Sequence, residues 1–327
     1  QVTEDLSVLA EGILRATVRR ALDTVNRSSN STPGFCVLAF GKLGGGELNY
    51  SSDIDLLAVL DESGANNRER AELYSRVVEM MVTDLSRHTE EGTAYRVDLR
   101  LRPYGAAGQS VHTLFALEEY YKNSAEIWEI QALLKLRPVA GDAKLGKQTA
   151  DQAHAFLREA YLADDIASSI RRMRTKAHHQ LFRRSLAAAT TTDIKSGPGG
   201  IRDIEFLVQG LQLMHLKNHP SLLEGNTLAA LDKLVDEKVL EREVADGLAE
   251  DYRFLRRTEH FLQLYDDRQT HSLPRQSEDL EALGKRVSES AETTANAFGA
   301  RLERCRERIE HAFNTYLPKT SSKHTSS

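Results

Sequence analysis

Two short apolar runs stand on either side of a glycine-rich segment, and this arrangement limits the folds open to the chain. The runs are FCVLAF (residues 35–40) and IDLLAVL (54–60), and GKLGGGELNYSSD (41–53) separates them. Apolar runs of this length, bounded by turn-forming residues, are typical of buried strands. Asp53 directly precedes the second run and Asp55 lies within it, so charges on a largely buried strand need an explanation.

Asp53 and Asp55 are one residue apart, and side chains at this spacing point to the same face of a strand. Two carboxylates held close together resist ionisation unless a cation lies between them. Mg²⁺ prefers oxygen ligands and keeps positions open for substrate phosphates, as phosphoryl and nucleotidyl transfer require. We therefore expect a divalent metal site here; the alternative for an isolated DxD pair is a solvated turn.

A third acidic residue follows in TAYRVDLRLRP (93–103), where apolar and charged side chains alternate as in a half-exposed strand. Asp98 lies on the charged side of this segment, and it completes the cluster if the segment lies beside the second apolar run. Three carboxylates can hold two metal ions, which together stabilise charge on a transferred phosphoryl group. The predicted catalytic and metal-binding residues are therefore Asp53, Asp55 and Asp98.

The glycine-rich segment is predicted to bind nucleotide or phosphate. Gly41, Gly44 and Gly45 allow turns and let backbone N–H groups approach phosphate oxygens. Lys42 and Ser52 lie in the same segment and are predicted to contribute to this site. The segment is not a P-loop, because no GK[ST] sequence ends it; the alternative for a glycine cluster is a flexible loop.

Two arginines beside the third aspartate are further candidates for binding phosphate. Arg100 and Arg102 have the same strand parity as Asp98, and a guanidinium presents a planar pair of donors to phosphate oxygens. An exposed strand face would carry the same residues, so the pattern alone leaves both interpretations open.

Helical periodicity dominates the rest of the chain. Strand signals vanish after about residue 113, so we predict an α+β chain: a small mixed sheet with helices, followed by an α-helical bundle. The predicted units are residues 1–140, with an N-terminal helix, and residues 141–316; the polar tail 317–327 is predicted to be disordered. Apolar residues recur at helical spacing in the ranges 3–27, 67–87, 113–137, 144–186, 202–218, 226–264 and 277–316.

Composition argues against several classes of protein. The chain of 327 residues has a formal net charge of -5, whereas nucleic-acid-binding domains usually carry a basic excess. Its longest apolar runs fall far short of the roughly 18 residues of a membrane span, and no signal peptide is evident. Cys36 and Cys305 lie far apart in the sequence, which favours a reduced cytoplasmic protein. The chain begins with Gln1, so we expect a fragment of a longer protein.

Four separated motifs resemble those of one bacterial family, the glutamine synthetase adenylyltransferase/deadenylylase enzymes. The resemblance extends from residue 3 to about residue 316 and keeps the motifs in the family's order. The motifs are FGKLGGGELNYSSDIDL (40–56), YRVDLRLRPYGAAG (95–108), GGIRDIEFLVQ (199–209) and FLRRTEHFLQLYDDRQTHSLP (254–274).

The resemblance implies a polymerase-β-like nucleotidyltransferase fold followed by a helical domain. It places the family's metal-binding aspartates on Asp53, Asp55 and Asp98, with Mg²⁺ as the expected cofactor and Mn²⁺ as an alternative. The turn carries Gly41-Lys42 where the wider superfamily has Gly-Ser, as this family does. The implied partners are glutamine synthetase, the PII signal protein, ADP or ATP, and phosphate; no nucleic acid or membrane is expected.

Enzymes of this family contain two homologous catalytic halves, and the present chain has room for one. The N-terminal half removes AMP from a glutamine synthetase tyrosine by phosphorolysis, and the C-terminal half attaches AMP from ATP. GGGELNYSSDIDL (44–56) and the segment ending in DDRQTHSLP (266–274) are more similar to the N-terminal half, so we expect removal of AMP. The alternatives are the adenylylating half and a non-catalytic module that binds glutamine synthetase or PII.

Overall fold

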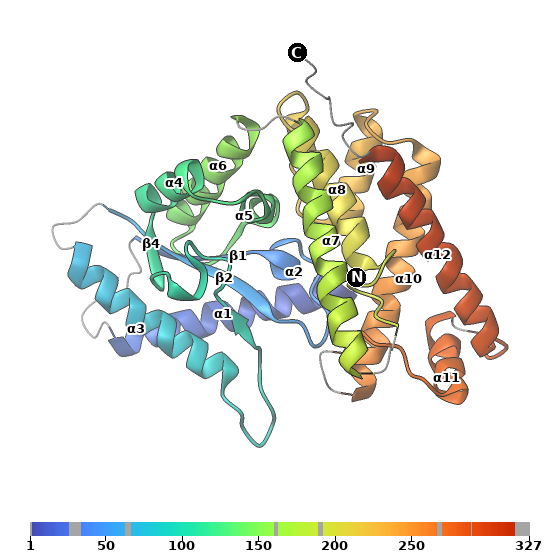
Figure 1. Cartoon of the computed structure of the whole chain (residues 1–327). Helices are drawn as coiled ribbons and strands as arrows, with labels where there is room; N and C mark the ends of the chain where they lie inside the picture. Colours follow the sequence, from blue (N-terminus) through green and yellow to red (C-terminus); the bar gives the residue numbers. More distant parts are fainter. Residues whose placement is uncertain are drawn as a thin grey trace, which may run out of the picture. The chain divides into compact units, whose positions relative to one another are not determined.

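The chain divides into two compact units in the computed structural model, and each is described by itself (Figure 1). The first unit comprises Gln1–Glu159 and the tripeptide Glu224–Asn226, and the second comprises Ala160–Leu223 and Thr227–Ser327. The structure describes residues 2–25, 34–62, 67–159, 163–188, 192–266, 270–288 and 290–317. From residue 318 onward, the tail predicted to be disordered lies outside these ranges.

The first unit is built on a small mixed sheet, as predicted. Its strands are β1 (Phe35–Ala39), β2 (Ile54–Leu60), β3 (Val97–Asp98), β4 (Val111–Thr113) and β5 (Arg137–Gly141). The order is β3-β2-β1-β5, and β4 also pairs with β2. β1 is antiparallel to β2 and β5, whereas β3 and β4 are parallel to β2. The two apolar runs therefore form the antiparallel pair at the centre of the sheet.

The strand β5 corrects the prediction that strand signals end at about residue 113. Pro138 lacks a backbone N–H and Gly141 has a φ of +85°, so this segment carries little of the usual signal for a strand. It nevertheless pairs with β1, where the register shifts between Val37 and Leu38. The contact with a strand far away in the sequence decides its conformation.

The strand predicted over residues 93–103 is also shorter than expected, because β3 has only two residues. After Asp98 the backbone turns, and the N–H of Arg102 donates to the carbonyl of Leu99 at 3.2 Å. Arg100 and Arg102 therefore do not lie on a strand with Asp98. The parity argument for their side chains was wrong, and the positions of these arginines follow from the turn instead.

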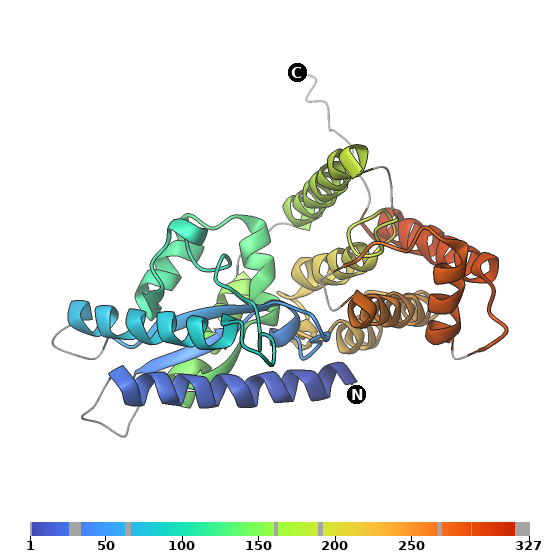
Figure 2. The same ribbon diagram turned by 90° about the horizontal axis from the view of Figure 1, so that it is seen from below.

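Helices cover both faces of this sheet. They are α1 (Val2–Val25), α2 (Gly41–Gly44), α3 (Asn67–Ser86), α4 (Leu114–Asn123), α5 (Ile127–Ala132) and α6 (Ala143–Glu159), with the 3-10 turns η1 (Gly105–Ala107) and η2 (Leu133–Lys135). α1 and α3 pack on the face that carries Val37, Ile54 and Leu56, which are fully buried, and Figure 2 shows α1 running along one side of the sheet. Asp53 and Asp55 alternate with Ile54 and Leu56, so their side chains are directed away from this core.

The second unit consists of helices, as predicted. They are α7 (Ala163–Ala188), α8 (Ile201–His215), α9 (Thr227–Asp236), α10 (Arg242–Asp266), α11 (Ser277–Ser288) and α12 (Ala295–Tyr316), with the 3-10 turn η3 (Pro220–Leu222). α8 contacts α7, α9, α10 and α12 and so lies at the centre of the packing. The buried core draws on these helices through Ile170, Ile204, Leu211, Leu255 and Phe313.

No helix in the described ranges is long and apolar enough to cross a membrane. Cys36 and Cys305 are both buried free thiols. Burial raises the pKa of the Cys36 thiol to about 12, so this thiol is protonated and unreactive at neutral pH.

His112 on β4 gives the first unit a defined response to acid. The residue is 7% exposed, and burial lowers its pKa from 6.5 to about 4. Between pH 6.5 and about 4 the unfolded chain binds a proton that the folded chain does not, so stability falls as the pH falls through this window. We expect His112→Gln to reduce the slope of the unfolding free energy against pH. The reduction corresponds to at most one bound proton, which is about 1.4 kcal/mol per pH unit.

Urea unfolding of the wild type and of His112→Gln at several pH values checks this expectation. The fluorescence of Trp128 reports on the first unit, because this residue is the chain's single tryptophan and lies on α5. Burial also lowers the pKa of His154, so some pH dependence remains in the variant. Equal slopes for the two proteins would contradict the prediction.

Candidate active site

The three predicted aspartates lie on two neighbouring strands. β2 and β3 are parallel, and Asp55 is the register partner of Asp98. The N–H of Ile54 donates to the carbonyl of Arg96 at 2.9 Å and so extends this pairing to the residue just before β3. Asp53 precedes Asp55 by two residues, and strand alternation gives both the same face. The prediction that the segment of Asp98 lies beside the second apolar run is therefore confirmed.

Two of these carboxylates bind arginines. Asp53 accepts from Nε of Arg96 at 2.6 Å, and Nη2 of the same arginine donates to the carbonyl of Ser51 at 2.7 Å. Asp98 accepts from the backbone N–H of Arg100 at 2.8 Å and from its Nη2 at 2.5 Å. The contacts of Asp98 stabilise its ionised form, and the side-chain hydrogen bond from Arg100 is the main cause that lowers the pKa of this carboxyl group.

The guanidinium of Arg100 lies in the electrostatic field of all three aspartates. Its pKa is raised mainly by the hydrogen bond and charge of Asp98, and then by the charges of Asp55 and Asp53. The guanidinium contacts Asp98, and the other two carboxylates act on it through their charge. Carboxylates gathered around one positive charge are also what a divalent metal site requires.

The donor set fits a hard divalent cation in its chemistry, because it consists of carboxylate oxygens. A Cβ built on Gly41 would lie 2.3 Å from Oδ2 of Asp55, so only a glycine leaves room for this carboxylate at the turn. As they stand, no three His, Cys, Asp or Glu side chains in the described part of the chain are gathered closely enough to hold a metal ion. Asp53 and Asp98 are directed at their arginines, and a metal role for the three aspartates stays a prediction.

The glycine turn is shaped by close backbone packing. Gly41 opens α2 with a φ of +57°, in the left-handed region that favours glycine. A Cβ on Gly44 would lie 1.9 Å from the carbonyl oxygen of Lys135, and one on Gly45 would lie 2.6 Å from that of Gly225, within the same unit. Packing alone explains why these two positions are glycines, and their contact with phosphate stays a prediction.

Two basic residues that were not predicted from the sequence hold this turn in place. Nε of Arg137 donates to the carbonyl of Gly44 at 3.0 Å, and its Nη2 donates to that of Leu43 at 2.9 Å. Lys135 forms an ion pair with Glu47 at 2.6 Å, and their side chains are only 8% and 6% exposed. The two basic residues alternate in the sequence LKLRP before and at the start of β5. That alternation was the available signal for a common role.

The remaining predicted residues lie at the edges of the site. Ser52 is buried, and its Oγ accepts from the N–H of Asn49 at 3.2 Å, which shapes the loop that leads to Asp53. Lys42 is half-buried in α2. Arg102 donates to the carbonyls of Leu99, Ala106 and Gly108 and so organises the loop after β3. Phosphate binding by these three residues stays a prediction.

The motif GGIRDIEFLVQ of the second unit forms a buried ionic cluster. Asp203 is 2% exposed and accepts from the N–H of Gly199 and from Nη2 of Arg174, both at 2.8 Å. His178 lies 3.2 Å from the same carboxylate, and Arg174 also pairs with Glu310. Asp203 in the first turn of α8 thus binds the backbone that leads into this helix and joins the helix to α7, which gives the motif a structural role within this unit.

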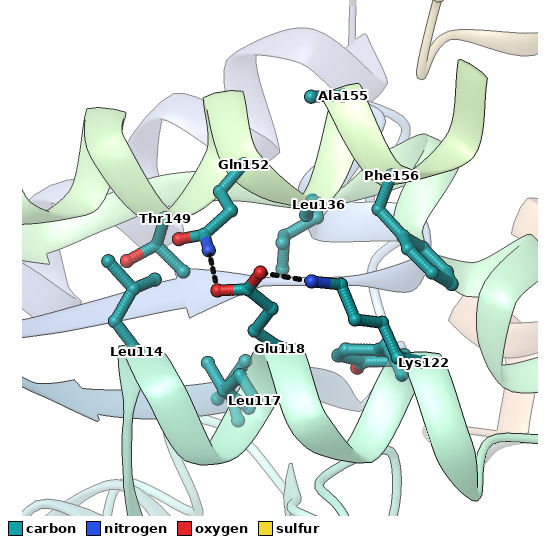
Figure 3. Close-up of a pocket in the computed structure, with 12 residues that line it drawn as sticks. Leu114, Leu117, Glu118, Lys122, Leu136, Thr149, Gln152, Ala155 and Phe156 are labelled. Carbon is teal, nitrogen blue, oxygen red and sulfur yellow. Dashed lines mark hydrogen bonds and ion pairs between the residues drawn. The ribbon is translucent and has the colours of Figure 1, made fainter. Parts of the chain in front are cut away.

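A cavity of about 210 Å³ lies elsewhere in the first unit, between α4 and α6 (Figure 3). Its lining is mostly apolar and includes Leu117 and Phe156, and Leu57 of β2 also contributes to it. Glu118 accepts hydrogen bonds from Lys122 and Gln152 at this cavity. None of the site residues predicted from the sequence lines it.

The small mixed sheet with acidic residues on two paired strands, followed in the chain by a helical unit, defines a polymerase-β-like nucleotidyltransferase fold with a helical domain. Residues 1–152 match the family model of glutamate-ammonia ligase adenylyltransferase. Residues 169–317 match that of GlnD PII-uridylyltransferase. The two matches therefore fall on different parts of the chain.

Several curated relatives, which all have the same name, align with most of the chain. Each is called a bifunctional glutamine synthetase adenylyltransferase/adenylyl-removing enzyme. The relative from Xanthomonas campestris is 39% identical over 76% of this chain and 26% of its own length. The relative from Methylococcus capsulatus is 37% identical over 89% of this chain and 30% of its own length. The relative from Nitrosococcus oceani is 36% identical over 96% of this chain and 33% of its own length.

These matches confirm the resemblance seen in the motifs: the chain belongs to the family of glutamine synthetase adenylyltransferases/adenylyl-removing enzymes. It spans about a quarter to a third of the length of the relatives that it matches. It therefore corresponds to one part of such an enzyme.

Proposed function

We propose that the chain is a metal-dependent nucleotidyltransferase that removes AMP from an adenylylated tyrosine of glutamine synthetase by phosphorolysis. The observation that carries the proposal is the pairing of Asp55 with Asp98, with Asp53 on the same face, beside a turn where only glycine fits. The names of the relatives support the reaction class and glutamine synthetase as the substrate. Mg²⁺, or Mn²⁺ in its place, is the proposed cofactor.

The residues of the site have different roles in the proposed reaction. Asp53, Asp55 and Asp98 would hold the metal, which when bound supplies positive charge to stabilise the phosphoryl group being transferred. The guanidinium groups of Arg96 and Arg100 lie beside these carboxylates and offer planar pairs of donors to phosphate oxygens. Positioning and electrostatics carry most of the rate in such reactions, so no strong base is required.

The proposed reaction exchanges one phosphorus–oxygen bond for another. An oxygen of inorganic phosphate forms a bond to the adenylyl phosphorus, and the bond from that phosphorus to the tyrosine oxygen breaks. The tyrosine oxygen takes up a proton, and ADP leaves. The similarity of residues 44–56 and 266–274 to the N-terminal half of the family supports this direction over transfer of AMP from ATP.

A second proposed partner is the PII signal protein. The support for it is the match of residues 169–317 to a family described as a PII-uridylyltransferase. PII would regulate the reaction, and glutamine synthetase would be its substrate.

One preparation assayed in both directions tests the proposed function. With adenylylated glutamine synthetase, phosphate and Mg²⁺, we expect release of ADP, which chelation of the metal by EDTA should stop. Formation of AMP-tyrosine and pyrophosphate from ATP and unmodified glutamine synthetase would instead assign the adenylylating reaction. Binding of glutamine synthetase with neither product would mean that the chain is a non-catalytic module.

A further inference from the structure

Two arginines form ion pairs with carboxylates that the proposed metal site requires. Arg96 binds Asp53 at 2.6 Å, and Arg100 binds Asp98 at 2.5 Å. The arginine side chains are 49% and 77% exposed, so they can turn into solvent without unpacking the core. A cation that binds these carboxylates competes with the two guanidinium groups.

The two arginines are held differently. Arg96 also donates from Nη2 to the carbonyl and to Oγ of Ser51, at 2.7 and 3.3 Å. The guanidinium of Arg100 forms its hydrogen bonds and ion pair with Asp98, and the charges of Asp55 and Asp53 also act on it. Its backbone N–H also binds the Asp98 carboxylate, so truncation of the side chain leaves one orienting contact in place.

We propose that Arg96 and Arg100 exchange partners during the reaction: they bind the carboxylates of Asp53 and Asp98 in the absence of the metal, and phosphate oxygens of the substrate in its presence. The exchange keeps every charge compensated, because the metal neutralises the carboxylates while the phosphate neutralises the guanidinium groups. Metal and phosphate therefore support each other's binding. This inference rests on the metal-dependent transfer proposed above.

Opposite changes in two affinities are the signature of this exchange. Removal of a competing cation close to the carboxylates strengthens their attraction for a metal ion. We expect Arg100→Met to bind Mn²⁺ about tenfold more tightly and Arg96→Met about threefold more tightly, because the guanidinium of Arg100 donates to both oxygens of Asp98 whereas that of Arg96 donates to one oxygen of Asp53. Both variants lose donors for phosphate, so we expect each to bind inorganic phosphate in the presence of Mg²⁺ about tenfold more weakly.

Electron paramagnetic resonance of free Mn²⁺, with no nucleotide added, measures the first affinity in the full chain. Calorimetric titration with inorganic phosphate measures the second. Arg68→Met is the matched control, since Arg68 forms an exposed ion pair with Glu72 on α3 and its loss changes the net charge equally. Arg100→Lys keeps the competing charge and is expected to bind Mn²⁺ as the wild type does. Circular dichroism checks that each variant is folded.

The outcomes separate this inference from the proposed function. Tighter Mn²⁺ binding together with weaker phosphate binding in the arginine variants supports the exchange. Mn²⁺ binding that is unchanged or weaker in those variants overturns the exchange and leaves the metal site standing. Failure of the wild type and every folded variant to bind Mn²⁺ overturns both.

Discussion

Replacement of Asp55 by Asn is expected to reduce the release of ADP from adenylylated glutamine synthetase by about a thousandfold or more, a loss of ~4 kcal/mol of transition-state stabilisation. Asp55 lies between the other two acidic residues, as the register partner of Asp98 and two residues after Asp53. The amide keeps the shape of the side chain but lacks the negative charge that would hold the metal beside the reacting phosphorus. Initial rates of ADP formation at saturating Mg²⁺ measure the effect.

A second acidic residue of the same unit provides the control for this substitution. Asp84 on α3 pairs with Arg20 at 2.8 Å, outside the acidic site. Asp84→Asn removes one carboxylate as well, and we expect it to leave the rate within about twofold, because surface pairs contribute little. If Asp55→Asn released ADP as fast as the wild type, these carboxylates would have no part in catalysis.

The replacement of Lys135 by Met is expected to destabilise the first unit by about 3–5 kcal/mol. The ammonium of Lys135 lies 2.6 Å from the carboxylate of Glu47, and both side chains are nearly buried. Loss of one charge from a buried ion pair leaves the other charge with a large desolvation cost. The midpoint of urea unfolding, followed by the fluorescence of Trp128, measures the loss in the unit that contains the turn.

Two further variants show whether the buried charge is the cause. The double variant Lys135→Met/Glu47→Leu removes both charges and should recover most of the lost stability, since apolar pairs often replace buried ion pairs without cost. Lys147→Met breaks a pair with Asp151 that is 75% and 60% exposed, and should change stability by less than about 0.5 kcal/mol. Equal losses for Lys135→Met and Lys147→Met would contradict the explanation.

The strand β3, which carries Asp98, shows what local sequence patterns predict and what they do not. Alternation over residues 93–103 correctly predicted that Asp98 lies on a strand, and the pairing of this strand with that of Asp55 was a condition that the structure meets. It did not predict that the strand ends at once in a loop, where Arg102 binds three carbonyls, because alternation of side chains carries no signal for such backbone contacts. The same alternation placed Arg96 with Asp98, but the contact of Arg96 with Asp53 needs the paired strand to be present.

The amino-acid sequence by itself determined the elements that carry the acidic residues. The runs 35–40 and 54–60 form β1 and β2, and the alternation of Asp53 and Asp55 with buried residues directs both carboxylates away from the core. Such features follow from sequence because apolar side chains must face the core, and a shift of one residue would reverse every side chain of the strand.

Only the tertiary structure decided what supports the site. Lys135 reaches Glu47 across 88 positions of the chain, and Arg137 reaches Gly44 across 93. Pro138 lies in a strand only because β1 is there to pair with it. The free energy of a buried ion pair or a paired strand depends on which distant groups exclude water around it. The local order of residues does not specify those distant groups.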